Sequence, residues 1–219
     1  MKKNGKRYLS LGAGLLVAFA VWTMLIQYID IQTVGVNGTK IGFATFNCWF
    51  HKLTGVHMIL YLITDWLGFV PLVVCMIFGG IGFAQLIRRR SLLKVDLDIL
   101  FLGIYYVIVI FGYLIFEIIP LNYRPILING FMEASYPSST TLLVLSVMPT
   151  LVFQTKRRIE SAKFKNIIYI LCVLFSAFMV VGRLISGVHW FTDIVGSVML
   201  SAGLFYVYKA LVLLCDKEY

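Results

Sequence analysis

The chain has 219 residues, of which 60% are hydrophobic and 13% are charged, and its formal net charge is +9. Soluble domains carry roughly 25% charged residues, so a chain this apolar is expected to lie in a bilayer. The composition also excludes a collagen, a coiled coil, a disulfide-rich scaffold and a disordered tail. The excess of positive charge would indicate nucleic acid in a soluble protein, so its meaning depends on where the basic residues lie.

Long uncharged windows divide the chain into six expected membrane spans, since a spanning helix needs about 20 mostly apolar residues. The windows cover residues 8–29, 66–87, 99–116, 134–155, 166–182 and 194–208. Another apolar stretch, residues 53–64, is too short to cross alone, so we expect a short interfacial or re-entrant helix before the second span. The sequence therefore predicts an all-α protein, with residues 1–219 forming a single six-span membrane domain.

The basic residues indicate how the spans are oriented. Alternate connecting segments hold 15 Lys and Arg residues, and the segments on the other face hold four: Lys40, Lys52, Arg124 and Arg183. Because Lys and Arg are in excess on the cytoplasmic side of short loops, both termini are expected in the cytoplasm. The positive charge is then a matter of topology, and no nucleic-acid partner is expected. Small size and a lysine-rich start favour a bacterial plasma membrane.

Several ionisable residues stand beside span ends on the face that has few basic residues. Such groups are costly at membrane depth, so they are expected to be paired or to line a polar cavity. If the last span begins near His189, Asp193 lies one turn further on the same face and can hold one ring nitrogen by a hydrogen bond. The other nitrogen is then free to attack a substrate. Arg183, at the preceding span end, can grip an anion.

A second group of polar residues lies between the third and fourth spans. Arg124 supplies a further guanidinium, and the segment 137–141, Pro-Ser-Ser-Thr-Thr, opens the fourth span. Hydroxyl groups and free N–H groups at a helix N-terminus form a natural anion site, which would involve Ser138, Ser139 and Thr140. Ordinary capping of the helix by these hydroxyls is the alternative.

Together these residues resemble the superfamily of type 2 phosphatidic acid phosphatases and vanadium haloperoxidases, in its integral-membrane lipid phosphatase branch. The motifs of that family read K-x6-R-P, P-S-G-H and S-R-x5-H-x3-D, in this order. The matching residues here are Arg124-Pro125, Pro137-Ser138, Arg183, His189 and Asp193. The resemblance covers the second half of the chain and places a phosphate site in residues 117–141 and 183–193.

The chain also departs from these motifs. Glu117 stands in place of the lysine of the first motif, and Gly182 in place of the serine of the third. Ser139 and Thr140 replace the glycine and the histidine of the second motif. Threonine is a far weaker acid than histidine, so the residue that usually protonates the leaving group is missing. Glu117 could replace it if burial kept its carboxyl group protonated; an ion pair with Arg124 or another arginine is the alternative.

The resemblance implies that His189 attacks phosphorus to form a phosphohistidine while Asp193 orients the ring. The substrate oxygens would be held by the other site residues, which are Arg124, Arg183, Ser138, Ser139 and Thr140. Neither a metal nor another cofactor is implied. Without a strong acid, a lipid pyrophosphate is the better substrate because its leaving group is a lipid monophosphate. A prenyl pyrophosphate such as the undecaprenyl carrier, hydrolysed on the extracytoplasmic face, is therefore expected.

Two other functions stay open at this point. A non-catalytic relative would bind phosphorylated lipid without cleaving it, and a lipid phosphotransferase would pass the phosphoryl group to an acceptor hydroxyl. A phosphorylated lipid in the bilayer is the partner in every case. His51 and His57 could approach the site from the first outer segment, but interfacial residues with polar tips are the simpler explanation. The sequence does not define the oligomeric state.

Overall fold

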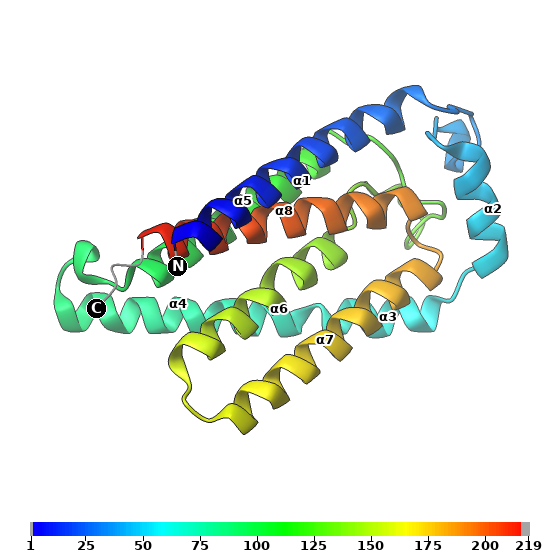
Figure 1. The fold of residues 1–219 in the computed structure, drawn as a ribbon. Helices are drawn as coiled ribbons and strands as arrows, with labels where there is room; N and C mark the ends of the chain where they lie inside the picture. Colours follow the sequence, from blue (N-terminus) through cyan, green and yellow to red (C-terminus); the bar gives the residue numbers. More distant parts are fainter. Residues whose placement is uncertain (1, 216–219) are drawn as a thin grey trace.

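The computed structural model describes residues 2–215, which form helices joined by loops (Figure 1). In chain order the elements are α1 (Lys2–Tyr28), η1 (Val36–Gly38), α2 (Ala44–Thr54), α3 (Met58–Leu67), α4 (Phe69–Arg89), η2 (Leu92–Lys94), α5 (Leu97–Ile118), α6 (Ser139–Arg158), α7 (Ala162–Ile185) and α8 (Phe191–Cys215). Over this range, β-structure is limited to isolated bridges, so the all-α prediction is confirmed.

Five segments of the described chain are long and apolar enough to cross a membrane. They are α1, the segment Met58–Arg89 that joins α3 to α4, α5, α7 and α8. Large apolar side chains point outward from these helices, with Met76 65% and Leu174 62% exposed. Such surfaces are expected where helices face lipid, so the chain is an integral membrane protein.

The remaining long helix, α6, was predicted as the fourth span but does not meet the same criterion of length and apolarity. Its polar residues explain the difference, because Ser146, Thr150 and Gln154 all lie on it and are fully buried. α6 contacts α4, α5, α7 and α8, so it lies in the middle of the bundle. A helix enclosed in this way presents little surface to lipid and tolerates polar residues that bond to its neighbours.

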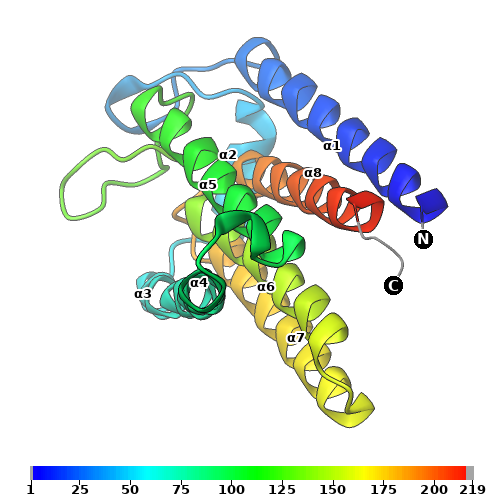
Figure 2. The ribbon, with the colours of Figure 1, turned by 90° about the vertical axis from the view of Figure 1, so that its left-hand side faces the viewer.

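The first and last helices run antiparallel along each other (Figure 2). At one end, the indole N–H of Trp22 donates to the carbonyl oxygen of Thr192 at 3.2 Å. Near the middle, a Cβ atom added to Gly12 would lie 2.8 Å from a side-chain carbon of Val207. The glycine therefore allows the two helices to approach closely, as small residues do in membrane bundles.

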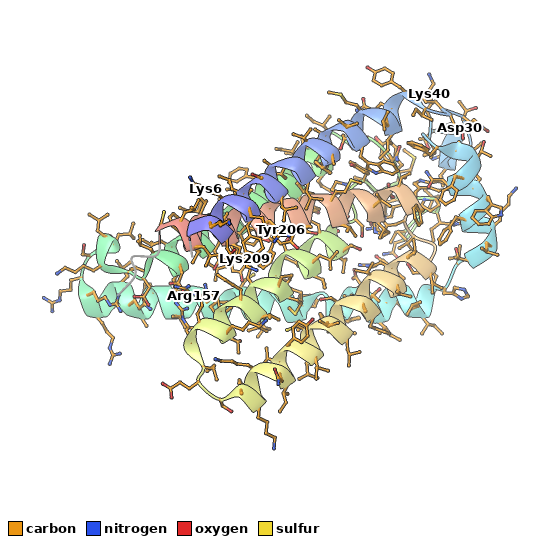
Figure 3. All side chains as sticks on the ribbon, viewed as in Figure 1. Lys6, Asp30, Lys40, Arg157, Tyr206 and Lys209 are labelled. Carbon is orange, nitrogen blue, oxygen red and sulfur yellow. The ribbon has the colours of Figure 1, made fainter. Side chains whose placement is uncertain are left out.

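The basic segments gather at one end of the bundle. The start of α1, η2, the turn between α6 and α7 and the end of α8 lie toward the left of Figure 1, opposite α2. Figure 3 likewise shows Lys6, Arg157 and Lys209 in one half of the molecule and Lys40 at the far end. This grouping is the one that the alternation of basic segments predicts.

The short helix predicted over residues 53–64 is placed differently in the structure. α2 ends at Thr54, followed by Gly55 with a φ of +71°, and only Gly68 separates α3 from α4. We expected Asp65 to separate the short helix from the second span. This boundary was wrong, because one apolar segment continues from Met58 to Arg89. Asp65 instead lies inside it and pairs with Arg183 of α7.

Candidate active site

His189 lies in the short loop between α7 and α8, two residues before α8 begins. The loop turns at Gly187, which has a φ of +72° and whose added Cβ would lie 2.1 Å from the carbonyl oxygen of Gly55. Only glycine fits such a position without moving the backbone. The ring Nε2 of His51 also lies 3.0 Å from the carbonyl oxygen of Gly187. The turn between α2 and α3 thus fixes the loop that carries His189.

Asp193 lies in the first turn of α8 and is fully buried. Its Oδ2 accepts the backbone N–H of Trp190 at 2.8 Å, which is the arrangement of a capping box. The same oxygen is 3.7 Å from Nδ1 of His189, too far for a hydrogen bond. The predicted direct bond is therefore not formed, because His189 sits in the loop before the helix. The hydroxyl of Ser135 donates to Oδ2 and lies 3.3 Å from Nδ1.

The hydrogen bonds around His189 assign its proton to Nδ1. The carbonyl oxygen of Ser135 lies 3.1 Å from Nδ1 and can only accept. The Ser135 hydroxyl donates its own proton to Asp193, so it too can only accept from the ring. A neutral ring then carries hydrogen on Nδ1 and a lone pair on Nε2. Among the described residues, Nε2 is buried and has no hydrogen-bond partner.

The surroundings of His189 keep its ring neutral. Burial lowers the pKa of His189 to about 4; the contact with Asp193 opposes this effect and the positive charge of Arg124 adds to it. At pH 7 the imidazole is therefore unprotonated on Nε2. A neutral imidazole is the form that can act as a nucleophile.

Arg183, in the last turn of α7, is 1% exposed. Its Nη2 donates to Oδ1 of Asp65 at 2.7 Å and to the hydroxyl of Thr140. Within residues 2–215, its Nε and Nη1 atoms are buried and have no hydrogen-bond partner. One nitrogen therefore holds the guanidinium in place, and two remain to bind an anion.

The close packing of α3 on α7 explains the glycine before Arg183. A Cβ atom added to Gly182 would lie 2.7 Å from Cγ2 of Thr64. A serine, as in the third motif of the resembled family, would push α3 away from α7. Gly182 thus allows α3 to bring Asp65 against Arg183.

Arg124 lies in the loop between α5 and α6, and its side chain is 10% exposed. Nη2 pairs with Oε2 of Glu133 at 3.0 Å, while Nε and Nη1 have no partner among the described residues. The ring centroid of Tyr61 lies 5.7 Å from Cζ of Arg124 and 4.9 Å from Cζ of Arg183. One aromatic ring of α3 thus contacts both guanidinium groups by cation–π interaction and brings two positive charges together.

The residues at the start of α6 have different roles: some hold the helix in place and one lines the cavity. The Ser138 hydroxyl donates to Thr141 at 3.1 Å, and its backbone N–H donates to the carbonyl oxygen of Asp193 at 3.4 Å, so Ser138 joins α6 to α8. Ser139 borders the cavity described next, and Thr140 bonds Arg183. The first N–H groups of α6 have no acceptor within the helix, and the positive end of the helix dipole lies there.

A cavity of about 220 Å³ brings His189, Arg124 and Ser139 together, while Arg183 is not among its wall residues. Its walls are formed by Tyr113, Phe116, Glu117, Arg124, Glu133, Ala134, Tyr136, Pro137, Ser139 and His189. His189 and Arg124 therefore face one space. Glu117, exposed at the end of α5, also borders it, but within residues 2–215 it forms no ion pair. The alternative reading of Glu117 as an arginine partner is not supported, because Arg124 pairs with Glu133 instead.

His51 and His57 do not border this cavity; they contact the loop between α7 and α8. The backbone N–H of His57 donates to the carbonyl oxygen of Ser186 at 3.0 Å, and the His51 ring centroid lies 5.7 Å from that of Trp190. Over the described part of the chain, no three His, Cys, Asp or Glu side chains are grouped as a metal site would require.

Comparison with known proteins agrees with this arrangement. The family model described as the PAP2 superfamily matches residues 116–215, which include every motif position of the site. The second half of the chain is therefore similar to the PAP2 superfamily. It is also similar to the crystal structure of the first transmembrane PAP2 type phosphatidylglycerolphosphate phosphatase from Bacillus subtilis, with a TM-score of 0.64 and 17% sequence identity. The match covers 94% of this chain and 98% of that chain and establishes the fold. No curated protein matches the sequence significantly.

Four residues of this candidate site were missed by the sequence motifs: Tyr61, Asp65, Glu133 and Ser135. For two of them a signal existed, since Asp65 and Glu133 are carboxylates in apolar surroundings, where a buried partner is expected. Tyr61 and Ser135 carry no such signal, because their role follows from how α3 and the loop before α6 pack against the motif residues.

Proposed function

We propose that this protein is an integral-membrane lipid phosphatase of the PAP2 type that acts through a phosphohistidine on His189. One observation carries the proposal: His189 and Arg124 line the same polar cavity. The His189 ring is buried and neutral, and its Nε2 has no hydrogen-bond partner among the described residues. A nucleophile with an orienting neighbour, beside unpaired guanidinium nitrogens, is the arrangement that phosphoryl transfer needs.

In the proposed reaction, the lone pair of Nε2 attacks phosphorus and the bond from phosphorus to the leaving oxygen breaks. The leaving group departs with the electron pair. The unpaired nitrogens of Arg124 and Arg183 and the free N–H groups of α6 stabilise the charge on the remaining oxygens. Water then attacks phosphorus, and the bond from phosphorus to Nε2 breaks. Inorganic phosphate is released, and the neutral imidazole of His189 is regenerated. Asp193 stabilises the positive charge that the ring gains in the first step.

A groove beside the cavity supports a lipid substrate. It has a volume of about 360 Å³ and shares Tyr113 and Ser139 with the polar cavity. The rest of its wall is mostly apolar and includes Phe69, Leu72, Val109, Ile110, Leu142 and Leu143. A phosphate group in the polar cavity would therefore leave a hydrocarbon chain lying in the groove between α4, α5 and α6.

Within this class, a prenyl pyrophosphate is the proposed substrate. Thr140 bonds Arg183 and takes the place of the acid histidine of the family, so no strong acid is available at that position. A lipid monophosphate leaves more readily than an alkoxide and needs less protonation. We further propose that α6 crosses the bilayer as a sixth span inside the bundle and that the cavity opens to the extracytoplasmic side, opposite the basic end.

The test is release of inorganic phosphate by the purified protein from a panel of lipid monophosphates and pyrophosphates. We expect pyrophosphates to be hydrolysed faster, and His189→Ala to lower release by at least about 10⁴-fold, as loss of a nucleophile does. A protein that binds these lipids but releases no phosphate would be a non-catalytic relative. Transfer of the label to an added alcohol in place of water would identify a phosphotransferase. Equal release by the wild type and His189→Ala would end the proposal.

A further inference from the structure

A second groove lies between α6, α7 and α8 and extends from Leu145 to Lys156 along α6, toward the basic end of the bundle. It has a volume of about 380 Å³ and shares no residue with the polar cavity or with the groove beside it. Its wall is formed by Leu145, Met148, Pro149, Val152, Phe153, Lys156, Tyr169, Cys172, Val173, Ser176, Phe205 and Lys209. The groove is thus apolar along most of its length and carries two lysines.

Both lysines contact aromatic rings and no acid. The Nζ atom of Lys156 lies 5.3 Å from the ring centroid of Tyr169, and that of Lys209 lies 4.0 Å from the ring centroid of Tyr8. Within residues 2–215, no carboxylate lies within 4.0 Å of either ammonium group. In the described part of the chain, two positive charges therefore lie beside an apolar groove without a neutralising carboxylate.

The neighbouring arginines differ in this respect. Arg158 donates to Oδ2 of Asp98 at 2.7 Å, and Nε of Arg157 lies 3.2 Å from the same oxygen. Within residues 2–215, Asp98 thus neutralises the arginines at the end of α6, while the two lysines of the groove have no carboxylate partner.

We infer that this groove binds an anionic phospholipid of the adjacent leaflet, with its phosphate at Lys156 and Lys209 and an acyl chain along the apolar wall. Basic pockets between membrane helices bind anionic headgroups in this way. Lys209 lies in the same half of the molecule as Lys6 and Arg157 (Figure 3), and Lys156 directly precedes Arg157 in the last turn of α6. An apolar ligand without a charge would form no ion pair with the lysines. An anionic phospholipid can pair its phosphate with them and bury an acyl chain in the groove.

The experiment measures lipid binding and is independent of the proposed phosphatase activity. The full chain, purified in neutral detergent, is titrated with phosphatidylglycerol or with phosphatidylcholine of the same acyl chains, and bound lipid is counted by native mass spectrometry. We expect phosphatidylglycerol to bind more tightly. The double variant Lys156→Gln/Lys209→Gln should weaken its binding by about tenfold or more. Phosphatase activity should remain in this variant.

Two controls separate the groove from general surface charge. The double variant Lys163→Gln/Lys165→Gln removes the same charge from the start of α7, outside the groove, and should change binding less than about threefold. Ser176→Leu keeps every charge but fills the groove, and should displace the lipid. Equal binding of both phospholipids, an equal loss in the two lysine variants or unchanged binding in Ser176→Leu would each overturn the inference.

Discussion

Nδ1 of His189 lies 3.7 Å from Oδ2 of Asp193, and the hydroxyl of Ser135 stands beside both atoms. The orienting role that the third motif gives to the aspartate is therefore shared with a serine from the loop before α6. Because both oxygen atoms of Ser135 near the ring act as acceptors, this residue also fixes which nitrogen carries the proton. Two separate segments of the chain thus position the proposed nucleophile.

Replacing Ser135 by alanine should test this shared role. The variant keeps the backbone carbonyl at Nδ1 but removes the hydroxyl and leaves Oδ2 of Asp193 with one donor fewer. We expect kcat to fall by about 10- to 100-fold, with KM changed by less than about threefold, because substrate oxygens bind elsewhere. Ser135→Thr retains the hydroxyl and should recover most of the rate. A Ser135→Ala enzyme with unchanged kcat would show that Ser135 does not position the ring.

The depressed pKa of His189 predicts an unusual acid limit of activity. The reactive form is the neutral ring, which persists above its pKa of about 4. We expect kcat/KM to be maintained as the pH falls from 7 to 5 and to drop only near pH 4. A loss centred near 6.5, the ordinary value for histidine, would contradict the buried, neutral ring.

The same shift affects folding stability. In the unfolded chain His189 takes up a proton below about pH 6.5, whereas the folded protein resists this until about pH 4. Stability of the wild type should therefore fall relative to His189→Gln as the pH is lowered across this window. Thermal unfolding of both proteins at several pH values measures the difference, and a constant difference would argue against the shift.

Glu117 is exposed and borders the cavity without an arginine partner among the described residues, so its substitution tests whether it donates the proton that the missing histidine would give. Acid catalysis contributes about 10²–10⁴-fold, and more for poor leaving groups. If Glu117 is the acid, Glu117→Gln should slow hydrolysis of lipid monophosphates by at least about 10²-fold and that of lipid pyrophosphates by less than about tenfold. The matched control is Glu160→Gln at the basic end. Equal effects on both substrates would assign Glu117 a structural role.

Gly187 should not tolerate substitution for two reasons: its φ is positive, and the carbonyl oxygen of Gly55 occupies the space of a side chain. In Gly187→Ala the new methyl group would meet the carbonyl oxygen of Gly55 at 2.1 Å, and the loop with His189 would have to move. We expect activity to fall by more than about 10²-fold and the melting temperature to drop, since a misplaced nucleophile loses much of its rate. Gly38→Ala has a similar φ of +75° in open space, so it controls for backbone strain alone. Similar losses in both variants would remove the packing argument.

The sequence predicted those parts of the fold that depend on apolar length and on charge. Uncharged windows located the helices that became α1, α5, α7 and α8, and the alternation of basic segments grouped the loops by end. The start of the second segment was missed because Asp65 resembles a span boundary until its partner Arg183 is known. Partners that lie far apart in the chain leave no periodic signal.

The sequence motifs predicted which residues belong to the candidate site but not how they are arranged. The motifs named His189, Arg124 and Arg183. The structure places His189 and Arg124 at one cavity beside Ser139, and the ring of Tyr61 contacts both Arg124 and Arg183. They did not reveal the gap between His189 and Asp193, which arises because α8 starts after the histidine. Such differences depend on the exact start of a helix and on loop packing, which spacing alone does not define.

The central claim is that Nε2 of His189 carries the phosphoryl group during turnover. The most direct measurement is to quench the purified protein during hydrolysis of a lipid pyrophosphate labelled with ³²P on the terminal phosphate, and to follow protein-bound label. The account predicts label that is stable to alkali, labile to acid and located at His189 in the wild type, and absent in His189→Gln. Turnover without such label, or label that persists in His189→Gln, would contradict it.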